Sequence, residues 1–283
     1  MSSEKPKLYE FVGSCWANVP KIAISETGWK DGEIEWVSIN LAEGKNFEPE
    51  YLKINPEGTV PSLVIDGKTL TDSTSVTSEI IKRAPHPPPA SAGTSTSIIE
   101  EVHADAHDPN ATLLCAVDDQ DRTAKVQGLP KAFLEGRQKA LDKIAPTAPE
   151  EFKAFLEKKQ KGNKAFLEFY TGNPDESARQ EHYKHAKELW KSAGILIRGV
   201  ITQAIKNNGG TFAAGNTPGE VDYHIITWLS RTITNTGVEP HSPASVAIPK
   251  LAEYTGGHEF DPVISKYWDA WLARDSFKKN KIH

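Results

Sequence analysis

The segment from Tyr51 to Ser73, YLKINPEGTVPSLVIDGKTLTDS, constrains the fold more than any other part of the chain. It predicts a short helix, a turn at residues 55–58, and two strands joined by Asp66-Gly67. An Asp-Gly pair between two apolar runs is a strong signal for a tight hairpin turn. Pro61 precedes the first run, a position that tolerates proline because no N–H has to be donated to the sheet there. The segment therefore predicts a β-hairpin with a proline at its entrance.

The residues before this hairpin predict a strand, a helix and another strand. Lys7 to Val12 alternates and is rich in aromatic residues, which is typical of a strand. Trp16 to Ser25 carries apolar residues at helical spacing and ends close to Gly28. Ile34 to Ile39 alternates again. Because a strand–helix–strand unit implies two parallel strands, we expect residues 1–84 to form a thioredoxin-like α/β domain.

The composition changes after residue 84. Residues 85–97, PHPPPASAGTSTS, are rich in Pro, Ser and Ala, which predicts a linker. Helical patterns dominate from there, so we expect an all-α domain over 98–283. Breaks such as Gly128-Leu129-Pro130 and Gly162 predict an insertion around 110–171. The predicted helices cover 98–107, 129–144, 149–161, 176–207, 220–233 and 263–274.

Composition also limits the function. The 283 residues carry a net charge of -5, and this acidic balance argues against a nucleic-acid partner. Nothing approaches the roughly 18 consecutive apolar residues of a membrane helix, and the first ten residues lack a signal-peptide core. Two cysteines do not make a disulfide framework. We expect a cytoplasmic protein with no membrane partner. His103 and His107 lack further ligands, so we expect them on a solvated helix face and expect no metal site.

The first candidate site is the turn from Val12 to Asn18, VGSCWAN. A helix N-terminus lowers the pKa of a thiol, and a hydroxyl or amide donor adds a charge-assisted hydrogen bond to the sulfur. Ser14, Cys15 and Asn18 are the polar groups available for this task. The alternative for Ser14 is an ordinary helix cap. Sequence spacing alone does not separate the three residues.

Two further segments predict peptide binding. The residue before a proline is extended, so the backbone of Val60 in Thr59-Val60-Pro61 can pair with a bound peptide as an added strand. Ser73 is expected to cap the helix over residues 73–83, and Asp72 precedes it. A hydroxyl at a helix N-terminus forms a site for a carboxylate. The alternatives are a strand-entry proline and a plain helix cap.

These motifs together resemble the glutathione transferases. The resemblance covers residues 7–83 and resumes at 215–222, where Gly215 and Asp222 keep the family spacing and Gly219 replaces a capping hydroxyl. In that family the aspartate satisfies backbone donors at the start of a buried helix. The pattern INP-x-G-x-VP-x-L followed by DGK is most similar to bacterial and fungal glutathione-dependent β-etherases, which cleave aryl ethers of lignin fragments.

The resemblance implies glutathione as co-substrate, bound by Thr59, Val60, Pro61, Asp72 and Ser73. Either Ser14 or Asn18 would hold it as thiolate. The thiolate would attack an electrophilic, aromatic substrate lying between the two domains, in a detoxification or β-ether-cleaving reaction. Family members form homodimers, which we expect here as well.

Three aromatic residues are candidates for the walls of a substrate pocket, with core packing as the alternative: Trp190, Tyr223 and Trp228. Two other functions stay open. Thiol exchange, including removal of glutathione from mixed disulfides, would use Cys15. A non-catalytic protein with the same fold would bind a ligand without turning it over.

Overall fold

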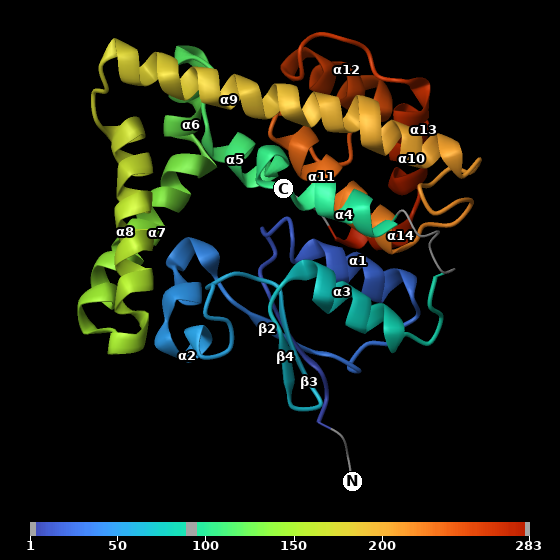
Figure 1. The fold of residues 1–283 in the computed structure, drawn as a ribbon, viewed down its shortest axis with the longest axis horizontal. Helices are drawn as coiled ribbons and strands as arrows, with labels where there is room; N and C mark the ends of the chain where they lie inside the picture. Colours follow the sequence, from blue (N-terminus) through green and yellow to red (C-terminus); the bar gives the residue numbers. More distant parts are fainter. Residues whose placement is uncertain (1–3, 89–94, 281–283) are drawn as a thin grey trace. The chain divides into compact units, whose positions relative to one another are not determined.

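The computed structural model describes residues 4–88 and 95–280. It confirms the predicted fold class, because a four-stranded thioredoxin-like α/β part is followed by a long helical part (Figure 1). The middle of the predicted linker, residues 89–94, lies outside the described residues. Within those residues, none of the helices combines the length and the apolar character that crossing a membrane requires.

The sheet has the strand order β2-β1-β3-β4. Strand β1 (Lys7–Glu10) is parallel to β2 (Glu35–Ser38) and antiparallel to β3 (Ser62–Ile65), which pairs with β4 (Lys68–Leu70). Asp66 and Gly67 both have positive φ angles, 49° and 72°. Two successive left-handed residues are the signature of a tight hairpin turn that matches strand twist. The predicted hairpin is therefore confirmed.

The chain divides into two units, and neither is continuous in sequence. The first contains residues 1–11, 34–72 and 114–186, and the second contains residues 12–33, 73–113 and 187–283. Residues 114–186, which include most of the predicted insertion, thus group with the sheet. The predicted division into a domain ending at 84, a linker over 85–97 and a domain beginning at 98 stays a prediction.

In the first unit, short helices follow β2: η1 (Leu41–Glu43), η2 (Lys45–Phe47) and α2 (Pro49–Leu52). Helices η2 and α2 share a buried cluster with two longer helices, α7 (Leu129–Ile144) and α8 (Glu150–Thr171), which run side by side (Figure 1). Helix α6 (Asp119–Gln127) packs on both. The apolar cluster is formed by Phe47, Leu52, Leu141, Ala145, Ala148, Phe152 and Leu156.

In the second unit, helix α11 (Glu220–Thr234) is the central element, since every residue from Val221 to Ile233 is buried. It contacts α1 (Asn18–Glu26), α3 (Ser73–Lys82) and α4 (Ser95–His103). The remaining elements of this unit are η3 (Asp105–His107), α5 (Pro109–Leu114), the second half of α9 (Glu176–Leu196), the π-helical segment η5 (Ile197–Ile201), α10 (Thr202–Asn207), α12 (Ala244–Tyr254), α13 (Pro262–Leu272) and α14 (Asp275–Lys279).

The start of α11 is capped as predicted. The carboxylate of Asp222 accepts the backbone N–H groups of Ala213, Ala214 and Gly219, at 2.7, 3.0 and 3.0 Å. Gly219 occupies the cap position itself. One buried side chain therefore satisfies three backbone donors, which is a structural role and not a catalytic one.

Candidate functional site

The turn before α1 places Ser14 at its start. Ser14 is half-buried, and its hydroxyl oxygen accepts the N–H of Ala17 at 3.2 Å. Helix α1 begins at Asn18 with Ala17 at its cap position, so Ser14 bonds within the turn before the helix and is not the helix cap itself. Because accepting this bond uses a lone pair of the oxygen, the hydroxyl hydrogen can still be donated to another group. The bond within the turn and thiolate binding are compatible in this residue.

Asn18 supports the same turn from inside. Its side chain is 1 % exposed, and its Nδ2 donates to the carbonyl oxygen of Ser14 at 2.9 Å. Among the described residues, its Oδ1 is buried without a hydrogen-bond partner. This arrangement fixes the backbone of Ser14 and leaves the amide little access to a ligand.

Cys15 lies in the interior of the second unit. It is 1 % exposed, and its Sγ donates to the carbonyl oxygen of Thr227 at 3.6 Å. Burial raises the pKa of Cys15 to about 12, although the nearby charge of Arg231 opposes this shift. A buried thiol with such a pKa stays protonated at neutral pH, whereas nucleophilic cysteines are thiolates and accessible. The geometry of Cys15 is that of a structural thiol.

Sequence reasoning missed Arg231, which also contacts this turn. Its side chain is 2 % exposed, and its Nη2 donates to the carbonyl oxygen of Gly13 at 2.5 Å. Burial lowers the pKa of Arg231, and the charge of Asp108 opposes this shift. An arginine in the run HIITWLSRTIT, which contains no other Asp, Glu, Lys or Arg, is the sequence signal that points to a buried, specifically bonded cation.

A stacked aromatic group supports the other side of the turn. The Trp16 indole stacks on the His103 imidazole, with ring centroids 4.0 Å apart. His103 Nε2 lies 2.7 Å from His224 Nδ1. Burial, followed by the charge of His103, lowers the pKa of His224 well below its usual value. The predicted solvated face for His103 is therefore wrong, because this imidazole is part of an internal contact between α4 and α11.

In the first unit, one buried amide organises the loop that contains Thr59, Val60 and Pro61. Asn55 is fully buried, and its Nδ2 lies 2.8 Å from the Thr59 carbonyl oxygen and 3.3 Å from that of Thr71. It therefore links the loop to the residue before Asp72. The Val60–Pro61 peptide is cis. Sequence reasoning placed Asn55 in a turn but did not identify this role.

Tyr51 reinforces the same loop. Its hydroxyl donates to the carbonyl oxygen of Thr59 at 2.5 Å and lies 3.0 Å from Ser62 Oγ. Burial raises the pKa of Tyr51 to about 12, so the phenol remains a neutral donor at physiological pH. The loop conformation is thus fixed by side chains from α2 and the turn that follows it.

The predicted cap at Ser73 is shifted by one residue. Helix α3 begins at Ser73, so Asp72 occupies the position before the first helical residue. Ser73 is 6 % exposed. Asp72 is exposed. The helix N-terminus predicted from these residues is present, with the aspartate and not the serine preceding it.

The three aromatic residues predicted as pocket walls belong to the core. Trp190, Tyr223 and Trp228 are 2 %, 1 % and 0 % exposed. Trp228 also donates its Nε1 hydrogen to the carbonyl oxygen of His107 at 2.7 Å. Core packing, the alternative stated for them, is the role that the structure gives them.

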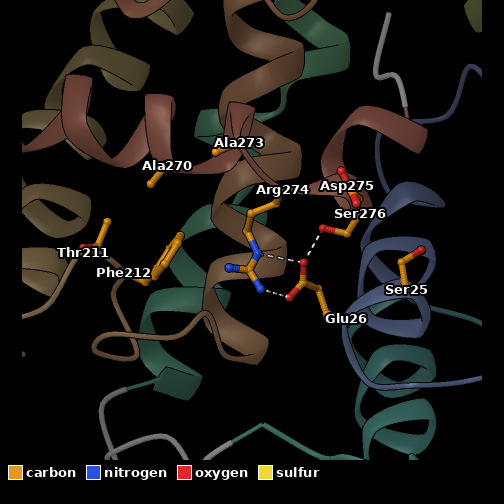
Figure 2. Close-up of a pocket in the computed structure, with 9 residues that line it drawn as sticks. All are labelled: Ser25, Glu26, Thr211, Phe212, Ala270, Ala273, Arg274, Asp275 and Ser276. Carbon is orange, nitrogen blue, oxygen red and sulfur yellow. Dashed lines mark hydrogen bonds and ion pairs between the residues drawn. The ribbon is translucent and has the colours of Figure 1, made fainter.

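A cavity of about 630 Å³ lies elsewhere in the second unit, beside the end of α1 (Figure 2). Glu26 and Arg274 form a two-bonded ion pair at its wall, with N–O distances of 2.8 and 2.5 Å, and Ser276 donates to Glu26 as well (Figure 2). The guanidinium of Arg274 also lies 5.7 Å from the ring centroid of Phe212. None of the predicted site residues lines this cavity, and its arginine is already neutralised.

Comparisons with known proteins place the similarity in the first third of the chain. Residues 8–88 match the glutathione S-transferase N-terminal domain family. Glutathione S-transferase Z1 of Arabidopsis thaliana is 35 % identical over 85 residues, which cover 30 % of this chain and 37 % of that protein. A zeta-class glutathione S-transferase of Euphorbia esula is 36 % identical over 84 residues, covering 30 % and 36 %. The chain spans little more than a third of the length of these relatives.

Solved structures extend the similarity of fold along almost the whole chain. Maleylacetoacetate isomerase from Methylobacterium extorquens AM1, solved with bound malonate and GSH, aligns with a TM-score of 0.57 and 16 % identity, covering 97 % of this chain and 95 % of the other. The β-etherase LigF from Sphingobium sp. strain SYK-6 aligns with a TM-score of 0.55 and 17 % identity, covering 98 % of both chains. At these identities the comparison establishes a shared fold.

Proposed function

We propose that this protein is a glutathione transferase in which Ser14 binds the sulfur of glutathione. The observation that carries the proposal is the position of Ser14, half-buried at the turn before α1, with its oxygen bonded to the Ala17 N–H and its hydrogen left to donate. The match of residues 8–88 to the glutathione S-transferase N-terminal domain supports it.

The proposed chemistry is nucleophilic substitution. A hydrogen bond from Ser14 stabilises the thiolate over the thiol, which increases the concentration of the nucleophile at neutral pH. The thiolate attacks an electrophilic carbon of an aromatic substrate, so that a C–S bond forms and the leaving group departs with the bonding electron pair. We infer a β-aryl ether as substrate class from the resemblance of the segment INP-x-G-x-VP-x-L, followed by DGK, to the β-etherases. Its C–O bond breaks, and the aryloxide then takes a proton from water.

We propose that Thr59, Val60, Pro61, Asp72 and Ser73 bind the rest of glutathione. The Val60 backbone would pair with the peptide as an added strand. The helix N-terminus at Asp72 and Ser73 would receive a carboxylate. The buried amide of Asn55 supports this assignment, because it fixes the Thr59 and Thr71 carbonyl groups together.

Thiol exchange through Cys15 is not supported, because the thiol is buried and protonated at neutral pH. We further propose a homodimer, as in the family that the sequence resembles. Light scattering on the purified protein would then give twice the chain mass of 31.1 kDa.

The first test is a thermal shift with and without millimolar glutathione, on the wild type and on Ser14→Ala, Cys15→Ser and Asn18→Ala. Glutathione at about 100 times its dissociation constant should raise the unfolding free energy by roughly 2.7 kcal/mol. Turnover is then measured on a β-aryl ether, a model aryl electrophile and maleylacetoacetate. We expect Ser14→Ala to retain binding and lose turnover, and Cys15→Ser to retain both.

Binding of glutathione without turnover of any of these acceptors would support the ligand-binding alternative instead. The absence of any thermal shift in the wild type would contradict the proposed function.

A further inference from the structure

One side of α11 carries the residues that contact the turn around Ser14. His224, Thr227 and Arg231 follow one another at intervals of three and four positions, so they share a helix face. All three are buried. The face therefore supports the turn at successive points: Arg231 contacts Gly13, the Thr227 carbonyl contacts Cys15, and His224 contacts Trp16 through His103.

Arg231 contacts the residue directly before Ser14. Its guanidinium donates to the carbonyl oxygen of Gly13 at 2.5 Å. The peptide between Gly13 and Ser14 is planar, so holding that carbonyl also fixes the direction of the Ser14 N–H and the position of its Cα. The other side of Ser14 is fixed by Asn18 and Ala17. The direction in which the hydroxyl can donate is thus set by the surrounding bonds.

The charge of Arg231 also acts on this turn. The guanidinium is removed from water, and a charge is screened less in the protein interior than at the surface. The acidic group that interacts with it is Asp108. Burial raises the pKa of Asp108, and its hydrogen bonds to Asn110 and the charge of Arg231 oppose this shift. Cys15 is neutral at pH 7 because burial raises its pKa to about 12, so it adds no negative charge here.

We propose that Arg231 is a positioning residue for Ser14: it fixes the turn through the Gly13 carbonyl, and its positive charge favours a thiolate bound at the Ser14 hydroxyl. The inference rests on the proposed function and adds a residue on a helix more than 200 positions away in sequence. The competing explanation is that Arg231 only stabilises the fold.

The test separates charge, geometry and stability. The variants are Arg231→Gln, Arg231→Lys and the double variant Arg231→Gln/Asp108→Asn. The double variant neutralises Asp108 together with Arg231, so that this carboxylate is not left without its cation. Ser230→Ala is the matched control, because Ser230 is the neighbouring buried residue on α11 and its Oγ has no hydrogen-bond partner among the described residues. The pH dependence of the thiolate absorbance of bound glutathione is measured together with kcat and KM.

In Arg231→Gln we expect the bound thiol to titrate about one pH unit higher, which means about tenfold less thiolate below that pH. We expect kcat to fall in parallel, while KM for glutathione changes by less than about twofold. In Arg231→Lys the bound thiol should titrate close to the wild-type pH, because lysine retains the positive charge. Ser230→Ala should match the wild type.

A folded Arg231→Gln that titrates like the wild type would overturn the inference. If this variant does not fold, the double variant decides by the same criterion. A wild type that shows no thiolate absorbance with glutathione would overturn the proposed function itself, and that outcome is visible before any variant is made.

Discussion

Ser14 and Asn18 share one turn, but we expect Asn18 to contribute mainly to stability and Ser14 mainly to turnover. Asn18→Ala removes the donor to the Ser14 carbonyl oxygen from a buried position. We expect a loss of about 1–3 kcal/mol in the free energy of unfolding, the usual result when a buried polar group loses its partner. Ser14→Ala removes a turn cap worth about 1 kcal/mol. Chemical denaturation of both variants measures these losses.

For turnover we expect the reverse order, with Ser14→Ala more affected than Asn18→Ala. Ser14→Ala removes the proposed donor to the sulfur, so we expect kcat to fall by about 10²-fold or more. Asn18→Ala should lose less activity than that, because it acts only through the backbone of Ser14. A stable Asn18→Ala without turnover, beside an active Ser14→Ala, would make Asn18 the donor.

The state of Cys15 leads to a prediction of reactivity. Burial raises its pKa to about 12, and only the thiolate is nucleophilic. We expect Cys15 and the equally buried Cys115 to resist alkylation in the folded protein at pH 7–8 and to react fully in denaturant. Mass spectrometry after timed alkylation checks this. Above about pH 9 the unfolded thiol ionises while the folded one does not, so Cys15 should lower stability as the pH rises from 9 towards 12.

Sequence spacing identified Ser14, Cys15 and Asn18 as candidates but did not rank them, for a physical reason. Their differences lie in burial and in bonding partners, and those come from α11. The carbonyl oxygen that receives the Cys15 thiol belongs to Thr227, which is 212 positions away. No local pattern in VGSCWAN carries that information. By contrast, the role of Asp222 followed from the resemblance to the family spacing, and its three backbone partners lie within nine residues.

At the scale of elements, the ion pair between Glu26 and Arg274 joins the end of α1 to the residue that precedes α14. The Glu26 side chain is 8 % exposed and the Arg274 side chain 33 % exposed. Breaking a buried pair costs about 3–5 kcal/mol, and surface pairs contribute about 0–1 kcal/mol. We expect Glu26→Gln to lose about 2 kcal/mol, between these limits, as measured by chemical denaturation.

The matched control for this pair is Lys278→Met, which breaks the ion pair between Lys278 and Asp275 at 53 % and 86 % exposure. Its unfolding free energy should stay within about 0.5 kcal/mol of the wild type. An equal loss in both variants would mean that burial does not set the strength of the Glu26–Arg274 pair.

The elements themselves were predicted unevenly. Long amphipathic segments were correct, and α7 has the predicted bounds of 129 and 144. Helix α8 was predicted to end at residue 161 but continues to Thr171. Gly162 lies on an open face of the helix, and a glycine inside a helix destabilises it by only about 1 kcal/mol. Helix α6 was missed because its residues are mostly polar, and α12 because Pro249 lies inside it. In both cases tertiary packing outweighs the local pattern.

At the scale of the whole molecule, the interleaving of the two units argues that neither end of the chain is an independent domain. The segment 12–33, which contains α1, groups with residues 187–283, while the strands on either side of it group with residues 114–186. Helix α1 contacts α11 and α14 as well as α3. The part of the chain that matches the transferase family, residues 8–88, therefore lacks partners that bury one side of its first helix.

We therefore predict that a fragment of residues 1–88 does not fold cooperatively. Without α11 and α14, apolar surface of α1 returns to water at about 25 cal/mol per Å², and a chain of this size has little stability in reserve. Glu26 and the Gly13 carbonyl also lose their partners. Far-ultraviolet circular dichroism during thermal unfolding should show a broad transition for the fragment and a sharp one for the full chain. A sharp transition in the fragment would contradict the prediction, because the contacts of α1 with α11 and α14 would then be dispensable for folding.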